Sequence, residues 1–329
     1  DARNTIYSVK RLIGRPYTSD EVRRARDRFS FGFEQGPTGG TLVVARGETY
    51  TLPEISAFVL REVRAIAEAA LARPCDRAVI TVPANFNELQ RNATKAAGRV
   101  AGMDVVRILN EPTAAALAYG LGRSDVSERV AVYDLGGGTF DITILELAGD
   151  VFEVVSTAGD SFLGGDDVDV LLADRMADGF LDDHRIDLRK DAQAYERLRA
   201  AAEWAKCQLS VETDVELCVE ELAYGEQGAS LDLNFRFTRA ELEEMIRPLL
   251  ARSFDVCEEA MEVAKLRPTQ LDNVVLVGGA TRIPLVRSMV SEYFGRDPLS
   301  SIDPDLVVAQ GAAVQGAALG GEKARVSLP

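Results

Sequence analysis

The sequence has few of the side chains on which several kinds of chemistry depend. Its single histidine, His184, lies in a polar stretch, so a Ser-His-Asp mechanism would have no other histidine to use. The four cysteines are too widely spaced for a zinc site or a Cys-x-x-Cys redox motif. They are Cys75, Cys207, Cys218 and Cys257. We therefore expect reduced thiols and a cytoplasmic protein.

Basic residues are in deficit, and long apolar runs are missing. The 37 Lys and Arg residues stand against 52 Asp and Glu residues, a net charge of −15. Because nucleic acid selects basic surfaces, we expect no nucleic-acid partner. Since no apolar run approaches the ~20 residues of a membrane helix, we expect no membrane association. Any catalysis must therefore use carboxylates, lysine, hydroxyls, backbone amides and metal ions. Phosphoryl transfer can run on these groups.

The segment from Val130 to Leu147 carries the strongest local signal. A compact apolar run ends at Asp134, three glycines follow at positions 136–138, and after Thr139 apolar and polar residues alternate with a period of two. This pattern predicts a β-hairpin. Successive glycines allow a ligand to approach backbone N–H groups, which can cradle phosphate, and a carboxylate at the strand end can hold hydrated Mg²⁺. An ordinary glycine-rich hairpin is the alternative.

The glycine segment does not have the form of the two commonest phosphate-binding motifs. It lacks the Lys-Ser/Thr of a Walker A loop, and the strand that follows it excludes a dinucleotide fingerprint. A phosphate-binding hairpin is typical of the actin, hexokinase and heat-shock ATPase superfamily. Two further segments, NEPTAAALAYG from Asn110 and VGGATRIP from Val277, follow the same pattern. From Lys10 to Leu319 the chain resembles the nucleotide-binding domain of the DnaK-type, seventy-kilodalton heat-shock chaperone family.

The resemblance implies an α/β fold with the two lobes of actin and hexokinase, each lobe a ribonuclease-H-like duplicate. We expect residues 1–123 and 299–322 in the first lobe, with 1–51 as its outer subdomain. We expect residues 124–298 in the second lobe, with 164–245 as its outer subdomain, and 323–329 as a tail. The family's opening Asp-Leu-Gly-Thr-Thr hairpin has no counterpart here. The sequence is thus interpreted as N-terminally truncated, with a first lobe that lacks its first strands and has an unpaired sheet edge.

Part of the first lobe is predicted without the resemblance. Strand, helix, strand and helix follow one another between Arg77 and Tyr119, a pattern that implies a parallel sheet with a right-handed crossover. Ligands bind such sheets beyond the carboxyl ends of the strands. Pro83 and Glu111 both lie there, so they are expected on the ligand side.

The resemblance also implies a catalytic set. Lys10 would reach the γ-phosphate and the attacking water. Asp134 would act on Mg²⁺ through water, and Glu111 would hold the metal's water shell or orient the attacking water. Asp141 would order water near the γ-phosphate, and Thr139 would complete the set by holding phosphate.

Further residues are expected to bind the nucleotide, ATP or ADP. Glu203, Lys206 and Ser210 share one helix face and would hydrogen-bond the ribose and base, although this spacing alone would also suit a surface ion pair. Arg282 would stack on the adenine through its planar guanidinium. The remaining expected contacts are Gly136, Gly137, Gly138, Thr139, Gly164, Gly165, Gly278, Gly279 and Asp305.

Coupling and partners follow from the same resemblance. Pro83 and Arg91 match the pair that relays nucleotide state to a substrate-binding domain, although Asn85 stands where the family usually has tyrosine. The implied partners are a J-domain co-chaperone, a nucleotide exchange factor and the protein's own substrate-binding domain. Unfolded polypeptide would be bound only indirectly, through that domain.

Three other functions remain open at this stage. The chain could be a scaffold that binds nucleotide without significant hydrolysis, a possibility favoured by the lack of the first hairpin. A sugar or acetate kinase of the same superfamily would need a second-substrate pocket with its own base, for which the sequence offers no motif. An actin-like filament former is disfavoured because the residues from Glu203 to Arg282 follow the chaperone pattern.

Overall fold

The computed structural model describes residues 1–120, 127–149, 151–225 and 228–320. Its helices are α1 (Asp20–Arg28), α2 (Leu52–Leu71), α3 (Glu88–Val100), α4 (Glu111–Ala118), α5 (Gly165–His184), α6 (Ala192–Leu209), α7 (Arg239–Ala264), α8 (Pro284–Phe294) and α9 (Val307–Leu319). Its strands are β1 (Gly32–Gln35), β2 (Thr41–Ala45), β3 (Glu48–Thr51), β4 (Arg77–Val82), β5 (Asp104–Asn110), β6 (Glu128–Leu135), β7 (Phe140–Ala148), β8 (Val151–Asp160), β9 (Asp214–Tyr224), β10 (Ser230–Thr238) and β11 (Asn273–Val277).

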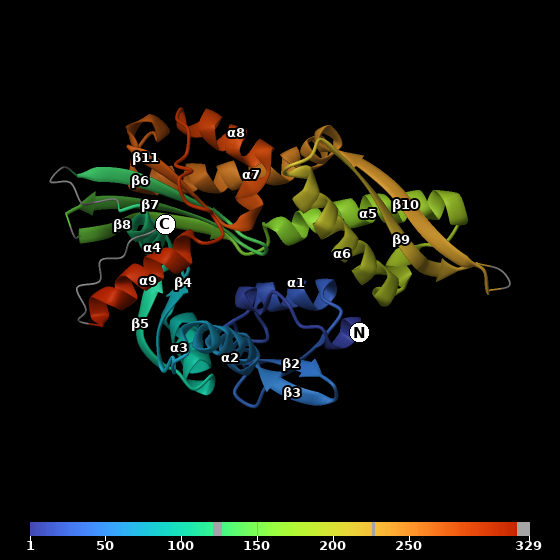
Figure 1. Ribbon diagram of the computed structural model, residues 1–329, viewed down its shortest axis with the longest axis horizontal. Coiled ribbons are helices and arrows are strands. Elements are labelled where there is room, and N and C mark those ends of the chain that lie inside the picture. The colour runs from blue at the N-terminus through green and yellow to red at the C-terminus, as the bar shows by residue number, and fades with distance from the viewer. Residues whose placement is uncertain (121–126, 150, 226–227, 321–329) are drawn as a thin grey trace.

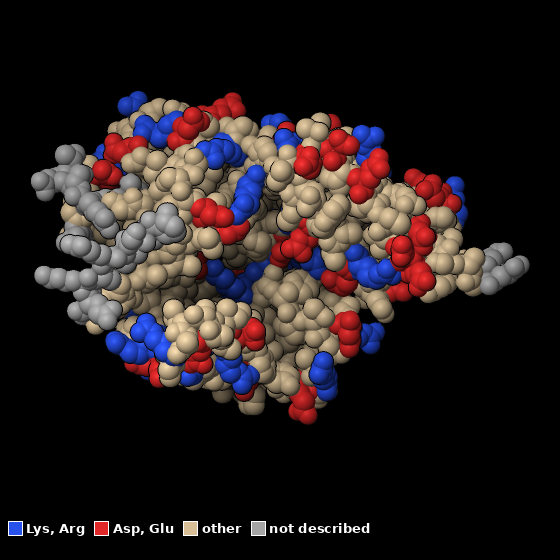
Figure 2. All heavy atoms as spheres, viewed as in Figure 1, with Lys and Arg blue, Asp and Glu red and all other residues tan. Residues whose placement is uncertain are grey.

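These elements form two halves that face each other (Figure 1). The first half contains α1 to α4 and β1 to β5. The second contains β6 to β11 with α5 to α8, and α9 returns from it to pack against α4 of the first half. The space-filling view in Figure 2 is hollowed between the halves, and acidic and basic side chains lie together in the hollow.

The first half is built on two small sheets. Strands β1, β2 and β3 form an antiparallel meander, and β4 pairs in parallel with β5. In the described part of the chain the other edge of β4 has no strand partner. Helix α2 begins at a capping box, in which Thr51 and Glu54 bond each other's backbone N–H. Its apolar stripe remains exposed, with Val59 61% and Val63 56% accessible.

The second half surrounds a four-stranded sheet in the order β11-β6-β7-β8. Antiparallel pairing of β6 with β7 sets Asp134 opposite Asp141, and parallel pairing of β11 with β6 sets Val277 beside Asp134. The sheet and its helices bury a large core that includes Tyr133 and Phe140. The register therefore brings residues 136–138, which we call the glycine turn, next to the Gly278-Gly279 segment at one edge of the molecule's hollow.

Two helices of small residues connect the halves. Alanines on α4 are buried where α9 crosses them, and Gly311 of α9 lies against the backbone of Ala114. A Cβ at position 311 would overlap the carbonyl oxygen of Ala114, so only glycine permits this crossing.

The α/β class with mixed parallel and antiparallel sheets is as expected. The predicted boundary between residues 123 and 124 and the tail at 323–329 lie outside the described residues, so the division into lobes stays a prediction. Within the described residues, every helix is too short or too polar to cross a bilayer.

Substituting Gly311 tests the close crossing of α4 and α9. Gly311→Ala should lower the free energy of unfolding by roughly 1–3 kcal/mol, because the new methyl group forces the helices apart. Gly316→Ala is the matched control on the same helix, since a Cβ there would meet only Val79 Cγ2 at 3.8 Å. Urea denaturation of both variants measures the difference. Equal stability of the two variants would contradict the tight crossing.

Candidate functional site

The floor of the site is made by backbone rather than by side chains. The amide of Gly136 donates to the carbonyl of Thr139 at 3.1 Å and closes the glycine turn between β6 and β7. From the start of α5, Gly165 N–H donates to Gly136 O at 2.9 Å and Asp166 N–H donates to Gly137 O at 2.7 Å. A Cβ at Gly164 would lie 2.5 Å from Gly137 O, so glycine is required there. The glycine turn is thus held directly on the N-terminus of α5.

A second glycine pair completes this floor. Gly278 has φ +88°, which favours glycine, and a Cβ there would overlap the carbonyl of Leu135. Its amide donates to Pro304 O at 3.0 Å, and a Cβ at Gly279 would lie 2.7 Å from a carboxylate oxygen of Asp305. The ends of β6 and β11 and the segment before α9 therefore meet at one point.

A lysine from the first half meets three carboxylates beside the glycine turn. Lys10 Nζ donates to both oxygens of Glu111, at 2.9 and 3.2 Å. Burial opposes a charged amine, but Glu111, Asp134 and Asp141 outweigh it and raise the pKa of Lys10. Burial and the neighbouring Glu111 raise the pKa of Asp134 to about 7, and burial with the charge of Asp134 raises the pKa of Asp141. The site thus holds carboxylates that favour a cation beside them.

The turn after β4 reaches into this cluster. Asn85 donates its side-chain amide to Asp141 Oδ1 at 2.6 Å, a bond between the two halves. Pro83 is buried in the same turn, and Arg91 from α3 donates to the carbonyls of Ala84 and Phe86. Arg91 also donates to Asn110 Oδ1 at 2.9 Å. The Pro83 turn is therefore tied both to the residue that precedes Glu111 and to the hairpin of the second half.

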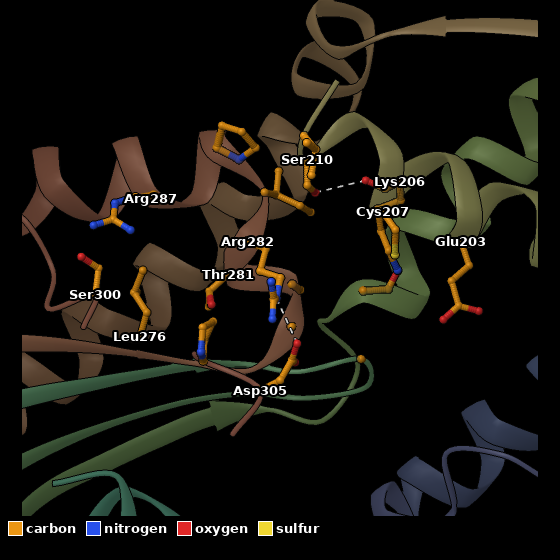
Figure 3. Close-up of a pocket in the computed structure, with 18 of the residues that line it drawn as sticks. Glu203, Lys206, Cys207, Ser210, Leu276, Thr281, Arg282, Arg287, Ser300 and Asp305 are labelled. Carbon is orange, nitrogen blue, oxygen red and sulfur yellow. Dashed lines mark hydrogen bonds and ion pairs between the residues drawn. The ribbon is translucent and has the colours of Figure 1, made fainter. Parts of the chain in front are cut away.

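A cavity of about 830 Å³ opens next to the glycine turn (Figure 3). From α6, Glu203, Lys206 and Ser210 line one side of it. Lys206 pairs with the buried Asp169 at 2.7 Å and donates to Gly165 O at 3.2 Å, which fixes it against α5. Burial raises the pKa of Asp169 to about 6 in spite of the lysine.

Arg282 enters the cavity from the other side. Its guanidinium donates to both oxygens of Asp303, at 2.5 and 2.6 Å, and to Asp305 Oδ2 at 3.0 Å. Figure 3 shows Arg282 directed at Asp305, with Arg287 and Ser300 beyond it. Two carboxylates therefore hold the guanidinium in one orientation, and its hydrogen bond to Asp303 raises its pKa.

The structure brings most of the predicted nucleotide residues together. Eight of them line the cavity, namely Gly137, Gly165, Glu203, Lys206, Ser210, Gly279, Arg282 and Asp305. The others, Gly136, Gly138, Thr139, Gly164 and Gly278, belong to the turns beside it. Sequence reasoning missed the partners of these residues: Asp303 for Arg282, Asn85 for Asp141 and Asp169 for Lys206. The departure from tyrosine at position 85 was the only signal for any of them.

The arrangement suits a nucleotide with a hydrated cation. The cavity has the size of a small-molecule site and offers a carboxylate, an amine and a hydroxyl along one wall. Gly137 of the glycine turn lines it, and Asp134 and Asp141 pair where the same turn begins and ends. In the described residues no three His, Cys, Asp or Glu side chains gather closely enough to hold a metal ion. A divalent ion here would take oxygen ligands from water and from the phosphates, as Mg²⁺ commonly does.

A comparison with known families gives one match. The family model described as "Hsp70 protein" matches residues 1–328. The match includes both halves and every residue of the site described above.

The raised pKa of Asp134 makes a prediction about stability without nucleotide or metal. The folded protein holds this proton more tightly than the unfolded chain, so the stabilisation is present below about pH 4 and is lost as pH rises through about 7. Residue 134 cannot ionise in Asp134→Asn. The free energy of unfolding of this variant, compared with that of wild type, should therefore rise from pH 5 to pH 8, by on the order of 1 kcal/mol. Urea denaturation at both pH values measures this. Asp182→Asn on α5 is the control, and an equal change in both variants would contradict the assignment.

Proposed function

Because this chain belongs to the Hsp70 family, as the nucleotide-binding domain of an Hsp70-type chaperone, we propose that it binds Mg-ATP and Mg-ADP in the cleft and hydrolyses ATP. Members of the family are ATPases that take ATP or ADP with magnesium. The observation that carries the proposal for this chain is the Lys10–Glu111 pair, which faces Asp134 and Asp141 beside an 830 Å³ cavity. The family match also favours this function over the kinase and filament hypotheses.

The phosphates would lie on the glycine floor. Backbone amides of residues 136–138 and the hydroxyl of Thr139 would hold the β- and γ-phosphates, with Gly164 and Gly165 at the start of α5 beside them. Asp134 would hold Mg²⁺ through water, and Glu111 would hold the same water shell. The ion, when bound, neutralises charge that develops on the phosphate oxygens.

Lys10 would act as a fixed positive charge in hydrolysis. Its raised pKa keeps the amine protonated, so it would orient the attacking water and the γ-phosphate rather than accept a proton. Asp141, held by Asn85, would order water on the same side. Placement of these groups supplies the catalysis, since phosphoryl transfer depends mainly on position and charge.

The adenosine end would occupy the cavity between α6 and Arg282. Glu203, Lys206 and Ser210 would hydrogen-bond the ribose and base, and Gly279 would allow close approach of the backbone. Arg282 would stack on the adenine, with Asp303 and Asp305 holding its guanidinium plane. This fixed orientation reduces the entropy lost on binding.

Nucleotide state would be relayed to a separate polypeptide-binding domain through Pro83 and Arg91. The support is the set of bonds from Arg91 to the Pro83 turn and to Asn110, next to Glu111. Members of the family work with J-domain proteins and exchange factors, and we propose the same partners here. The lobes in this cycle would be residues 1–123 with 299–322 and residues 124–298.

A nucleotide-binding scaffold without significant hydrolysis is the second candidate. One observation favours it: Glu111 engages two of the three N–H donors of Lys10, which leaves a single donor for phosphate and the attacking water. Calorimetric titration with Mg-ADP, followed by single-turnover hydrolysis of ATP, separates the candidates. Binding with turnover supports the ATPase, binding without turnover supports the scaffold, and no binding by the folded chain refutes both.

Asp134→Asn tests the metal role. The variant should bind Mg-ADP roughly tenfold to a hundredfold more weakly, because the carboxylate that orients the ion's water is lost. Binding of ADP in the presence of a metal chelator should change by less than about threefold, since Asp134 is not expected to touch the nucleotide itself. Isothermal calorimetry measures both affinities, and equal losses would exclude the metal role.

Lys10→Ala tests the catalytic role. Hydrolysis should slow by on the order of a hundredfold or more, because a positioned charge at the reacting group is removed. Affinity for Mg-ADP should stay nearly unchanged, since ADP lacks the γ-phosphate. Lys190→Ala, at an exposed position before α6, is the control. Unchanged single-turnover rates in the Lys10 variant would rule the assignment out.

A further inference from the structure

The segment that carries Lys10 is too short to hold its own shape. Lys10 is the middle residue of a three-residue 3-10 helix, Val9–Arg11, and the preceding Ser8 has φ 53° in the left-handed region. So short a helix has little intrinsic stability. Contacts from elsewhere must therefore fix the Lys10 turn, which we define as residues 8–11.

One carboxylate of the second half supplies contacts on both sides of Lys10. Ser8 Oγ donates to Asp166 Oδ2 at 2.6 Å, and Arg11 Nη2 donates to the same oxygen at 3.0 Å. Asp166 stands in the first turn of α5. Ser8 and Arg11, the two ends of the Lys10 turn, therefore bond the same oxygen atom across the cleft.

Asp166 is itself fixed to the glycine turn. Its amide donates to Gly137 O at 2.7 Å, and a Cβ on Gly137 would lie 3.3 Å from Asp166 Oδ1. Arg11 is buried, with its side chain 1% exposed, and a Cβ on Gly138 would lie 2.7 Å from its Nε. The guanidinium also lies 5.2 Å from the centre of the Phe162 ring. The Lys10 turn, Asp166 and the glycine turn thus pack together as one unit.

We propose that Asp166 is the positioning residue for Lys10. It holds the Lys10 turn on α5, so that the ammonium group is set against Glu111 and toward the phosphate floor only while the two halves are closed. Separation of the halves breaks both contacts with Asp166 and releases the turn. The proposal rests on the ATPase function above for its effect on rate, but the anchoring itself does not depend on hydrolysis.

Asp167, next to Asp166 in the chain, allows the positioning role of Asp166 to be distinguished from a general attraction between the halves. Asp167 pairs with Arg28 at 2.6 Å and lies 3.8 Å from Arg11, so it also bridges the halves. Ser8, however, bonds Asp166. Asp167→Asn removes the ion pair with Arg28 but leaves both bonds of Asp166 in place, so the Lys10 turn should stay held, whereas removal of the Asp166 side chain should free it.

The rate test compares variants at these two positions. Asp166→Ala should lower kcat for ATP roughly ten- to hundredfold, because a small displacement of a catalytic group has effects of that size. KM and the Kd for Mg-ADP should change by less than about threefold, since Asp166 is not expected to contact nucleotide. Asp166→Asn keeps an oxygen that accepts from Ser8 and should recover part of the rate. Asp167→Asn should keep a kcat close to that of wild type.

A second readout needs no turnover. The Lys10 side chain is 52% exposed, while its amine is bonded to both oxygens of Glu111, so the rate at which formaldehyde and cyanoborohydride methylate the amine reports how firmly it is held. Mass spectrometry of the Lys10 peptide should show faster labelling in Asp166→Ala than in wild type or Asp167→Asn. Ser8→Gly, which suits the left-handed backbone and leaves α5 intact, should show a smaller increase and serves if Asp166→Ala does not fold.

The outcomes are distinct. Faster labelling of Lys10 together with a selective loss of kcat supports the proposal. Unchanged labelling in both Asp166→Ala and Ser8→Gly would overturn it, as would equal effects of the Asp166 and Asp167 variants. If wild type binds nucleotide but does not hydrolyse ATP, the proposed function fails, and the labelling of Lys10 still decides whether Asp166 anchors the turn.

Discussion

Close contact between backbone segments at the floor of the cleft is the constraint on which the site depends. The glycine turn, the Gly164-Gly165 segment and the Gly278-Gly279 segment come from the ends of β6, the start of α5 and the end of β11. They pack so tightly that a Cβ at Gly164 or Gly278 would overlap a carbonyl group. Because these contacts join backbone to backbone, they fix the strand ends and the helix N-terminus relative to one another. The site residues of the second half are placed from this floor.

Like charges lie close together around the floor, which is electrostatically unfavourable. Asp134 and Asp141 face each other across the hairpin, with Glu111 near them and Lys10 as the cation that pairs with Glu111. Burial raises the pKa values of both aspartates, and the charge of Glu111 adds to it at Asp134 as the charge of Asp134 does at Asp141. A cavity that holds carboxylates in this way favours a cation, and the Hsp70 family binds nucleotide with magnesium.

Several of these groups reach the site from opposite halves. Lys10, Glu111 and Asn85 belong to the first half, while Asp134, Asp141 and the glycine turn belong to the second. The α4–α9 crossing joins the halves through small residues, whereas the bonds of Ser8 and Arg11 with Asp166 join them at the site. A movement of the halves would therefore change the geometry of the charged cluster directly, which would link the site to the proposed conformational cycle.

The sequence by itself determined the local features. The hairpin around the glycine turn and the shared face of Glu203, Lys206 and Ser210 follow from short-range rules of period. The resemblance carried by three motifs indicated the family and eight of the residues that line the cavity. Only the tertiary structure decided which side chains meet across the chain. Asp166 with Ser8, Asn85 with Asp141 and Asp303 with Arg282 are far apart in sequence, and no local pattern encodes such pairs. The exposure of the apolar stripe of α2 could not be predicted for a similar reason, because helical spacing marks a face but cannot show whether another element covers it.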